Sequence, residues 1–320
     1  MTLKTDDFSY VLPTDRISQA PAEPRESAKL MVVNRKTGTI THRHVADFPA
    51  YLKKGDVLVV NNTKVFHARL KKGNKELFLV RPHGDHWIAI GRNIKEKETL
   101  IFNETKICIT KKHSDGTLLV KIDTNDVISF ANTYGEIPIP PYIHTMPKDS
   151  DYQTVYAKFV GSVAAPTAGF HLTKPLLQKI KDKGVTILEI TLHVGLGTFM
   201  PIKSDTLDAH PMHSEWVEIT PEVAQQIKRA KRVVAVGTTT VRALEGTGCK
   251  SFQGDVNIFI QPGYKFKIVD AMLTNFHLPK STLIVLVSAF ASRELILKAY
   301  NEAVRKFYRF YSFGDAMFII

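Results

Sequence analysis

The sequence predicts an α/β fold in which a small β domain interrupts a main α/β domain. Between residues 64 and 130, five short runs rich in apolar and β-branched residues follow one another, with Gly, Asn, Asp and Ser between them. This texture is typical of a small antiparallel sheet or barrel. Beyond residue 149, strand-like and helix-like runs alternate, which indicates a largely parallel sheet or a barrel-like arrangement. The first sixty residues are too short to fold alone, so we assign them to the main domain.

A proline-rich segment marks the return from the β domain to the main domain. It reads GEIPIPPYI over residues 135–143, and its three prolines rule out a helix and suit a domain boundary. We therefore expect residues 1–63 to form the first part of the main domain and residues 64–148 to form the insert. Residues 149–320 would then form the second part, which carries most of the candidate site.

The strands of the first two sections are predicted from short apolar runs bounded by turn formers. KLMVVNR at residues 29–35 and GDVLVVNN at residues 55–62 predict strands, whereas QAPAEPRES at residues 19–27, with two prolines, predicts an extended, ordered loop. The five runs of the insert are KELFLV, HWIAI, ETLIFN, TKICIT and TLLVKI. No helix is predicted among them.

The last section alternates between the two periodicities. KPLLQKIKDKG and SRELILKAYNEAVRKF have apolar residues at helical spacing, and TPEVAQQIKRAKR opens with the Thr-Pro-Glu pattern of a helix start. VTILEITLHV at residues 185–194 predicts a long strand. VVAVGTTTVRALEG at residues 233–246 predicts a strand, a turn and a helix in succession.

The composition is that of a globular protein with an excess of positive charge. Of 320 residues, 44% are hydrophobic and 23% charged, with a formal net charge of +12. Such a balance favours nucleic acid as the partner, although a lysine-rich proteome explains it equally well. Two cysteines are too few for a disulfide scaffold. The N-terminus has no signal-peptide pattern, and the longest apolar run, STLIVLVSAFA, is too short to span a bilayer, so we expect a cytoplasmic protein away from membranes.

One stretch, GSVAAPTAGFHLT at residues 161–173, is small, apolar and almost uncharged, and leads to His171. A core segment would carry more Leu, Ile and Val, and a surface loop more charge. Several histidines lie in stretches that read as loops beyond strands, where α/β folds place their function. They are His171, His193, His210, His213 and His277.

The segment VGTTTVRALEG combines Thr239 and Arg242 with a strand-to-helix turn. Helix N-terminal amides and hydroxyls there can bind an anion, although ordinary capping by threonine explains the same pattern. Arg242 and Glu245 are three residues apart and can simply pair on the helix surface. TLHVGLGTFMP lacks the third glycine of a dinucleotide-binding motif, so a tight turn is the favoured interpretation there.

Two other segments carry candidate polar groups. DAHPMHSEW holds His210, His213 and Glu215, which together with His193 could ligate zinc. A proline between the two histidines disfavours a regular helix, so we prefer groups that orient an organic substrate and expect no metal. LTNFHLPKSTL holds Asn275 and His277 in a loop, although a lone histidine beside Phe and Leu is usually a core residue. The apolar C-terminus predicts a docked end, from which Asp315 could reach a site.

Seven blocks, in this order, resemble the S-adenosylmethionine:tRNA ribosyltransferase-isomerase family, whose members make epoxyqueuosine in tRNA. They are QAPAEPRES, YQTVYAKFVGSVAAPTAGFHLT, TLHVGLGTF, HPMHSE, VVAVGTTTVRALE, FIQPGYKFKIVDAMLTNFHLPKSTL and YRFYSFGDAM. The likeness runs essentially end to end. It implies a barrel-like main α/β domain with an inserted small antiparallel β-barrel domain.

The resemblance also implies an unusual use of S-adenosylmethionine, as the donor of its ribosyl group. The acceptor would be the aminomethyl group of 7-aminomethyl-7-deazaguanine at the wobble position of tRNAs with GUN anticodons. Adenine and methionine leave, and the ribose becomes an epoxycyclopentanediol. A tRNA partner accounts for the positive charge, and we expect the protein to act as a monomer. Two basic clusters could bind phosphate or be solvated faces, the second being better explained as a solvated face: Lys64, Arg69, Lys71, Lys72 and Lys75, and Lys228, Arg229, Lys231 and Arg232.

Residue chemistry inside the matching blocks selects the site. We predict proton transfer and sugar positioning by His171, His193, Glu215 and His277. For binding the donor or the modified base we predict Thr167, Thr198, Thr239, Arg242 and Asn275, with Arg25 and Asp315 as weaker candidates. Where the family reads Asn-Asp-Thr-Arg-Val, residues 61–65 read Asn-Asn-Thr-Lys-Val, so we give Asn62 and Lys64 no catalytic role.

Two other classes of function remain open from the residues alone. The first is a zinc-dependent hydrolase that uses His193, His210 and His213, which metal analysis of the protein would distinguish. The second is a non-enzymatic RNA-binding module built on the insert. That hypothesis leaves the histidine and threonine loops without a purpose and predicts no release of adenine.

Overall fold

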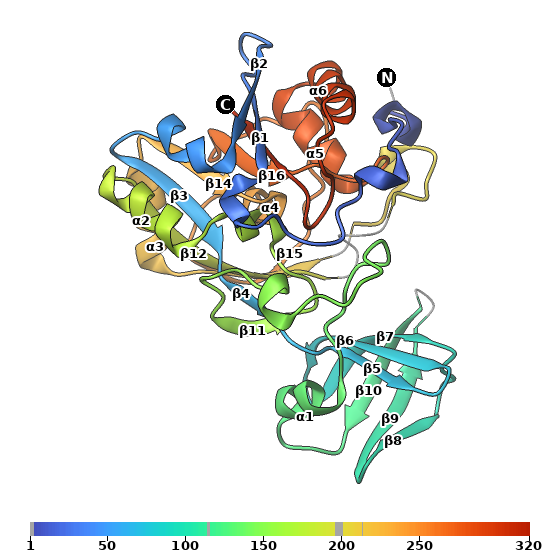
Figure 1. The fold of residues 1–320 in the computed structure, drawn as a ribbon. Helices are drawn as coiled ribbons and strands as arrows, with labels where there is room; N and C mark the ends of the chain where they lie inside the picture. Colours follow the sequence, from blue (N-terminus) through green and yellow to red (C-terminus); the bar gives the residue numbers. More distant parts are fainter. Residues whose placement is uncertain (1–2, 114–115, 196–200, 213) are drawn as a thin grey trace.

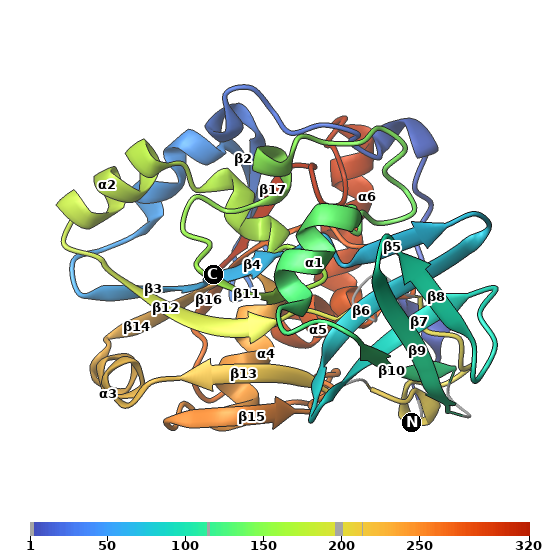
Figure 2. The ribbon, with the colours of Figure 1, turned by 90° about the horizontal axis from the view of Figure 1, so that it is seen from below.

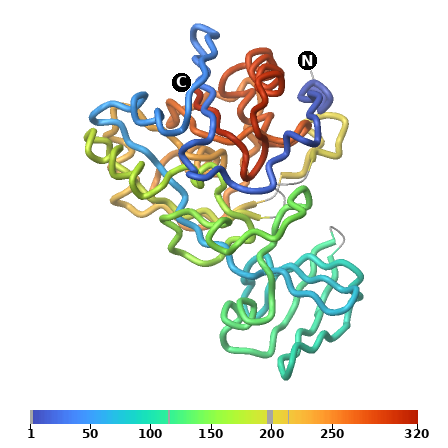
Figure 3. The backbone as a smooth tube through the Cα atoms, in the orientation of Figure 1, coloured from blue at the N-terminus to red at the C-terminus, as the bar shows by residue number. Residues whose placement is uncertain are grey.

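The computed structural model describes residues 3–113, 116–195, 201–212 and 214–320. Figure 1 shows a larger body built around one extended sheet and a smaller body, drawn in cyan and green, built around a second sheet. The chain passes between the two bodies twice, once in blue-cyan and once in green (Figure 3). The mixed α/β class expected from the sequence is therefore confirmed.

The large sheet has nine strands among the described residues, in the order β15-β13-β12-β3-β14-β16-β17-β1-β2. They are β1 Lys29–Val33, β2 Ile40–His44, β3 Asp56–Asn61, β12 Thr186–His193, β13 Glu215–Ile219, β14 Arg232–Val236, β15 Phe252–Val256, β16 Ala271–Asn275 and β17 Ala316–Ile319. Strands β12, β3, β14 and β16 are mutually parallel, and the flanking pairs are mostly antiparallel. Neighbours β3 and β12 come from opposite sides of residues 64–148, as expected if one sheet draws on both flanking sections.

Strand β3 shows why this sheet is buried on both faces. All six of its residues are buried, and successive side chains point to opposite sides. Val57 and Val59 join a core that includes residues of the helices α3 to α6. Leu58 and Val60 join a second core that includes α2 and the 3-10 helix Val45–Tyr51. Because both faces are covered, the strand reads as a continuous apolar run rather than an alternating one.

The smaller sheet is antiparallel and has six strands, in the order β5-β6-β7-β10-β9-β8. They are β5 Arg69–Lys72, β6 Lys75–His83, β7 His86–Arg92, β8 Thr99–Phe102, β9 Thr105–Lys112 and β10 Thr117–Ile122. The two edge strands approach each other, since Lys72 Nζ of β5 donates to the carbonyl of Ile101 in β8. The five predicted strands are confirmed. The expectation of no helix there was wrong in one respect, because α1 Val127–Tyr134 follows β10, capped by Asp126.

A third, two-stranded sheet joins the bodies. It pairs β4 Thr63–Val65 with β11 Phe159–Ser162 in parallel. Figure 2 shows these strands between β12 of the large sheet and the six-stranded sheet, and β11 contacts both β12 and β6. The proline-rich segment, residues 135–143, contains no helix, as predicted.

The remaining helices are α2 Lys174–Asp182, α3 Pro221–Arg229, α4 Thr238–Thr247, α5 Thr282–Ala291 and α6 Arg293–Arg305. All but α5 match their predicted positions, and α5 lies in an apolar run for which no helix was predicted. The hydroxyls of Thr173, Thr220, Ser281 and Ser292 cap α2, α3, α5 and α6 by accepting a backbone N–H three residues on. The apolar run at residues 281–291 is the buried helix α5. Within the described chain, none of the helices has both the length and the apolar character needed to cross a bilayer.

Candidate active site

One edge of the large sheet collects the candidate residues. The parallel strands β3, β12, β14 and β16 all end there, so Asn61, His193, Gly237 and Asn275 lie along the same edge. Strand β13 runs the opposite way and therefore begins there, with Glu215 near His193 in register. Ligands of open α/β sheets bind beyond the carboxyl ends of parallel strands, so this edge is the expected place for a site.

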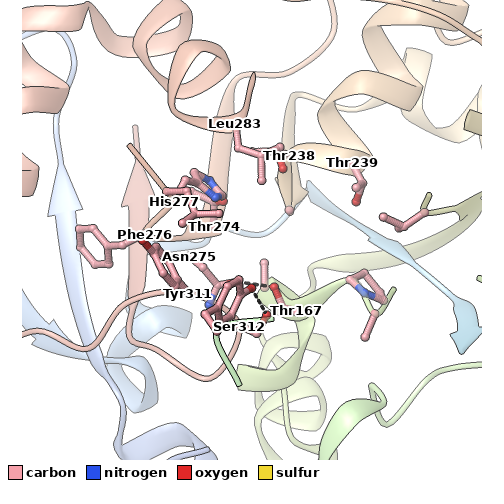
Figure 4. A pocket seen from close by; sticks show the side chains of 17 residues that line it. Thr167, Thr238, Thr239, Thr274, Asn275, Phe276, His277, Leu283, Tyr311 and Ser312 are labelled. Atoms are coloured by element: carbon pink, nitrogen blue, oxygen red, sulfur yellow. Dashed lines mark hydrogen bonds between the residues drawn. The ribbon is translucent and has the colours of Figure 1, made fainter. Parts of the chain in front are cut away.

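A pocket opens at the end of β14 and β16. Figure 4 shows Asn275, Thr167 and Ser312 gathered on one side of it, with Thr238, Thr239 and Leu283 across from them. Small side chains dominate the segment 165–168, so the backbone comes close to the space. The lining is Tyr142, Ala165, Pro166, Thr167, Ala168, Val194, Gly237, Thr238, Thr239, Thr274, Asn275, Phe276, His277, Leu278, Leu283, Tyr311 and Ser312. Predicted residues Thr167, Thr239, Asn275 and His277 are thus brought together.

Asn275 links two of the predicted residues. Its Oδ1 accepts a hydrogen bond from Thr167 Oγ1 at 3.0 Å, and its Nδ2 lies 3.4 Å from His171 Nε2. Thr167 and His171 are the ends of one short 3-10 helix, Thr167–His171. The amide therefore holds this helix against the end of β16 and leaves the ring nitrogen of His171 as an acceptor.

His171 is buried and lines a smaller pocket beside the first, together with Arg25 and Ser312. Burial, together with the positive charges of Arg309 and Arg25, lowers the pKa of His171 to about 4. The ring is therefore neutral at pH 7. The stretch of small residues 161–173 thus places a neutral histidine in the wall of the smaller pocket.

His277 is the second neutral ring, and it lines the main pocket. Its Nε2 lies 2.9 Å from Thr274 Oγ1, its backbone N–H donates to Tyr300, and its carbonyl accepts from Tyr10. Burial lowers its pKa to about 3. The ring is well anchored, so it combines the core packing that a lone histidine suggests with a place in the pocket wall.

His193 ends β12 and is held on three sides. Its Nδ1 lies 2.8 Å from Thr63 Oγ1, and its ring stacks on Trp216 with centroids 5.0 Å apart and planes 15° apart. On a third side it packs against Gly161, where a Cβ would stand 2.6 Å from His193 Nε2. Only glycine fits that position without moving the ring. Burial lowers the pKa of His193 to about 4.

Glu215 and Arg242 form a buried ion pair. Arg242 Nη1 donates to Glu215 Oε2, and its Nε donates to the carbonyl of Ile258 at 3.3 Å. Glu215 Oε1 also accepts from the backbone N–H of Gly195 at 3.4 Å. Both side chains are almost fully buried. The pair ties helix α4 to the start of β13 beside His193.

The alternative in which Arg242 pairs with Glu245 on a helix surface was wrong. Helix α4 is buried on nearly every side, so neither residue faces solvent. Glu245 instead accepts hydrogen bonds from the backbone N–H groups of residues 267, 268 and 269 and from Tyr264. Capping of α4 by a threonine was wrong as well. The N-cap residue is Gly237, which has no side chain to accept a hydrogen bond.

Arg25 and Asp315 make structural contacts. Arg25 donates to the carbonyls of Gln153, Phe170, Ser150 and Asp151, which fastens residues 150–153 beside the site. Asp315 is buried and accepts from the backbone N–H of Lys29 and from Arg309. Both lie near the sheet edge, and Arg25 also lines the smaller pocket.

Two predicted residues, Thr198 and His213, lie outside the described residues. His210 is described and packs its ring edge-on against Phe259. In residues 3–113, 116–195, 201–212 and 214–320, no group of three or more His, Cys, Asp or Glu is placed to hold a metal ion. The zinc hypothesis depends on His213, and metal analysis of the protein would test it.

Four residues that the sequence did not single out belong to this region. Tyr142 and Tyr311 form an aromatic wall of the pocket, with ring centroids 4.7 Å apart, and Tyr142 Oη lies 2.8 Å from Ser312 Oγ. Thr63 holds His193. Tyr142 comes from the proline-rich return segment, whose sequence indicates only a boundary.

The comparisons with known proteins identify the family of this chain. A family model described as "Queuosine biosynthesis protein" matches residues 5–319. The chain belongs to this family. A curated relative named S-adenosylmethionine:tRNA ribosyltransferase-isomerase, from Sulfurihydrogenibium sp. (strain YO3AOP1), is 50% identical over 336 residues, covering 99% of this chain and 100% of the relative. Another of the same name, from Desulfitobacterium hafniense (strain DSM 10664 / DCB-2), is 47% identical over 341 residues, with 99% and 100% covered.

A solved structure is also similar to this chain. It is S-adenosylmethionine tRNA ribosyltransferase from Thermotoga maritima, 35% identical, with a TM-score of 0.59 over 98% of this chain and 100% of that chain. The pocket is lined by residues from three of the sequence blocks that resemble the family, and these blocks lie far apart in the chain. Residues 161–173 contribute Thr167, residues 233–245 contribute Thr239, and residues 259–283 contribute Asn275 and His277.

Proposed function

We propose that this protein transfers and isomerises the ribosyl group of S-adenosylmethionine onto 7-aminomethyl-7-deazaguanine at the wobble position of tRNA. The product would be epoxyqueuosine-tRNA, with release of adenine and methionine. Two relatives that bear the name of this reaction are about half identical over the full length of the chain. The observation that carries the proposal is the convergence of Thr167, Thr239, Asn275 and His277 on one pocket.

The lining of the pocket suits a sulfonium-bearing nucleoside. Tyr142 and Tyr311 offer aromatic faces, on which a flat base or a cation can rest. Thr238 and Thr239 offer hydroxyls and backbone N–H groups at the start of α4, which suit polar groups of a ribose or a carboxylate. When bound, S-adenosylmethionine supplies a sulfonium that acidifies the hydrogens of its 5′-carbon.

The protonation states suit proton removal. His171, His193 and His277 are all neutral at pH 7 because burial lowers their pKa values. A neutral imidazole can accept a proton, whereas an imidazolium cannot. We assign this role to His171, because its Nε2 lies 3.4 Å from Asn275, a longer contact than those of His277 with Thr274 at 2.9 Å and of His193 with Thr63 at 2.8 Å. His171→Ala should then abolish most turnover, and near-normal turnover would show the assignment to be wrong.

The proposal extends to the acceptor, the domains and the residues around the pocket. The acceptor would be tRNA with a GUN anticodon, met by a cytoplasmic monomer. Residues 1–63 and 149–320 would form the barrel-like main domain, and residues 64–148 the inserted β-barrel domain. Glu215, Arg242, Thr198, Arg25 and Asp315 would assist the site, the ion pair by fixing the wall beside His193.

Release of adenine is the measurement that tests the proposal. Purified protein, S-adenosylmethionine and tRNA bearing the aminomethyl-deazaguanine would be mixed, and adenine and the tRNA nucleosides followed by mass spectrometry. We expect adenine together with an epoxyqueuosine nucleoside, and only with the modified tRNA. Folded protein that releases no adenine over a range of salt concentrations would overturn the proposal. If chelator-treated protein is shown by metal analysis to hold no zinc and still releases adenine, the zinc hydrolase is excluded.

A further inference from the structure

Strand β11 exposes an aromatic side chain beside the candidate site. Lys158, Phe159 and Val160 are three consecutive exposed residues, and the Phe159 side chain is 54% exposed. Phenylalanine is usually buried, because exposing its ring to water costs free energy. The described residues include one other strongly exposed phenylalanine, Phe307. The exposure of Phe159 therefore suggests a binding partner that covers its ring.

The position of Phe159 ties it to the site. In the β4–β11 pair it stands opposite Thr63, whose hydroxyl contacts His193. Two residues further along β11, Gly161 packs against the ring of His193. The strand also contacts β6 of the six-stranded sheet, so it lies where the two bodies meet. A ligand that reaches both the pocket edge and the smaller body would pass over this strand.

Two lysines lie close to Phe159. Lys64 is exposed and stands opposite Val160 in the same strand pair. Lys158 is exposed as well and pairs with Glu189 at 2.6 Å. Three other cations of the predicted basic cluster are neutralised, since Arg69 pairs with Glu76, Lys71 with Glu136 and Lys75 with Glu98. The fourth, Lys72, donates to the carbonyl of Ile101 at the far edge of the six-stranded sheet. Lys64 takes part in none of the ion pairs found among the described residues. Lys64 is therefore the cation that an anionic partner could bind beside Phe159.

We propose that Phe159 is a stacking platform for an unpaired base next to the reacting nucleotide, with Lys64 binding an adjacent phosphate. This inference rests on the proposed function, in which a tRNA loop carries the acceptor base. Enzymes that act on a base draw it out of its stack, which leaves its neighbours without a stacking partner. Single-stranded RNA is commonly held by aromatic side chains that replace that partner. An aromatic ring, a cation and a nearby pocket match that need.

The occupant is a single-stranded RNA loop rather than a protein or a membrane surface. The exposed apolar surface consists of one ring and Val160, flanked by lysines, which is too small for a stable protein interface. The net charge of +12 favours a polyanion. A base stacked on Phe159 and a phosphate on Lys64 use both properties at once.

The test compares Phe159→Ala with Phe307→Ala as a matched control. Phe307 is 64% exposed and lies under Arg16, away from the pocket lining. Binding of a synthetic anticodon stem-loop RNA would be measured without S-adenosylmethionine, at fixed salt. Loss of one stacked base should weaken binding by about tenfold to a hundredfold for Phe159→Ala. Phe307→Ala should bind like the wild type, and Phe159→Trp should retain affinity.

Two further readouts separate the possible failures. Phe159→Ala that binds RNA within about twofold of the wild type, less than the loss of one stacked base, would overturn the platform. Phe159→Leu, which keeps an apolar side chain without a ring, replaces the alanine variant if circular dichroism shows a folding defect, and it should be equally weak. Wild-type protein that binds the stem-loop but releases no adenine from the modified tRNA would count against the proposed function alone.

Salt dependence tests the second half of the proposal. Lys64→Ala should weaken binding and reduce the slope of log K against log salt by about 0.7, the release of counterions from one phosphate of single-stranded RNA. Phe159→Ala should leave that slope unchanged, because stacking releases no counterion. An unchanged slope for Lys64→Ala would remove Lys64 from the site.

Discussion

Thr63 Oγ1 lies 2.8 Å from His193 Nδ1, so a residue just beyond β3 orients a ring at the end of β12. Trp216 and Gly161 close two other sides of the same ring. The remaining freedom of His193 is rotation of its ring, which the hydroxyl restricts. Thr63 is therefore a positioning residue, and its effect should pass through His193.

Thr63→Val keeps the shape of the side chain and removes the hydroxyl. A hydrogen bond worth ~1 kcal/mol corresponds to about fivefold in rate, so kcat should fall by about five- to tenfold. The KM for S-adenosylmethionine should hardly change if His193 acts in the chemical step rather than in binding. Steady-state adenine release measures both values.

Thr63→Ser is the control, because serine restores the hydroxyl and should recover most of kcat. Equal defects in the valine and serine variants would mean that packing, not the hydrogen bond, matters there. Gly161→Ala should impair the enzyme more than Thr63→Val, since the added Cβ would stand 2.6 Å from His193 Nε2.

The Glu215–Arg242 pair makes a prediction about stability. Removing one partner of a buried ion pair leaves a buried charge without its counter-ion and costs about 3–5 kcal/mol of unfolding free energy. Arg242→Met should show this loss in urea unfolding. Glu218→Gln, on the same strand but partly exposed, should change stability by no more than about 0.5 kcal/mol.

A double variant sharpens that experiment. Glu215→Leu with Arg242→Met removes both charges together, so it should recover much of the stability lost by Arg242→Met alone. Additive losses in the double variant would show that the two side chains do not depend on each other.

Local patterns of the sequence predicted most of the framework. Strands β3 and β12 are apolar and β-branched, and the helix starts carry Thr or Ser caps that the structure reproduces. Strand β5 was missed because its sequence, RLKK, has a single buried residue, Leu70. Helix α1 was missed because VISFANTY is short and rich in residues with weak helix propensity.

The site was predicted as far as residue types and family blocks reach. Asn275, Thr167 and His277 were found because they stand in such blocks, and their convergence follows from parallel strands ending at one edge. Thr63 was missed because its contact with His193 depends on the pairing of β3 with β12 across the whole insert. The partner of Arg242 was not predictable either, because a helix pattern does not reveal that α4 is buried all round.

The buried histidines predict that stability depends on pH. Burial lowers the pKa of His171 to about 4 and that of His277 to about 3, whereas an unfolded histidine has a pKa near 6.5. Below about pH 6.5 the unfolded chain binds protons that the folded chain excludes, so folding stability falls as the pH falls, until the folded pKa values are reached.

His277→Gln should make that pH dependence shallower. Well below pH 6.5, each buried neutral histidine lowers folding stability by ~1.4 kcal/mol for every unit that the pH falls, and the glutamine variant lacks one such decrease. Urea unfolding at pH 6 and pH 5 measures the difference. His144→Gln, at an exposed histidine, should leave the wild-type slope unchanged. Parallel curves for His277→Gln and the wild type would mean that His277 is protonated in the folded protein.

The contact between Asn275 and His171 supports the sharpest test of a proton acceptor. Asn275 Nδ2 donates toward His171 Nε2 at 3.4 Å, and Oδ1 accepts from Thr167. Asn275→Asp would put a carboxylate beside the ring, which favours the charged imidazolium and raises the pKa of His171. If His171 must be neutral to accept a proton, turnover should fall as the pH is lowered, starting at a higher pH than in the wild type. Asn275→Ala removes the same contacts without a charge, so its acid limb should stay near that of the wild type. The pH profiles of kcat/KM for adenine release decide the matter, because equal profiles for the two variants would show that the charge of His171 is irrelevant to the reaction.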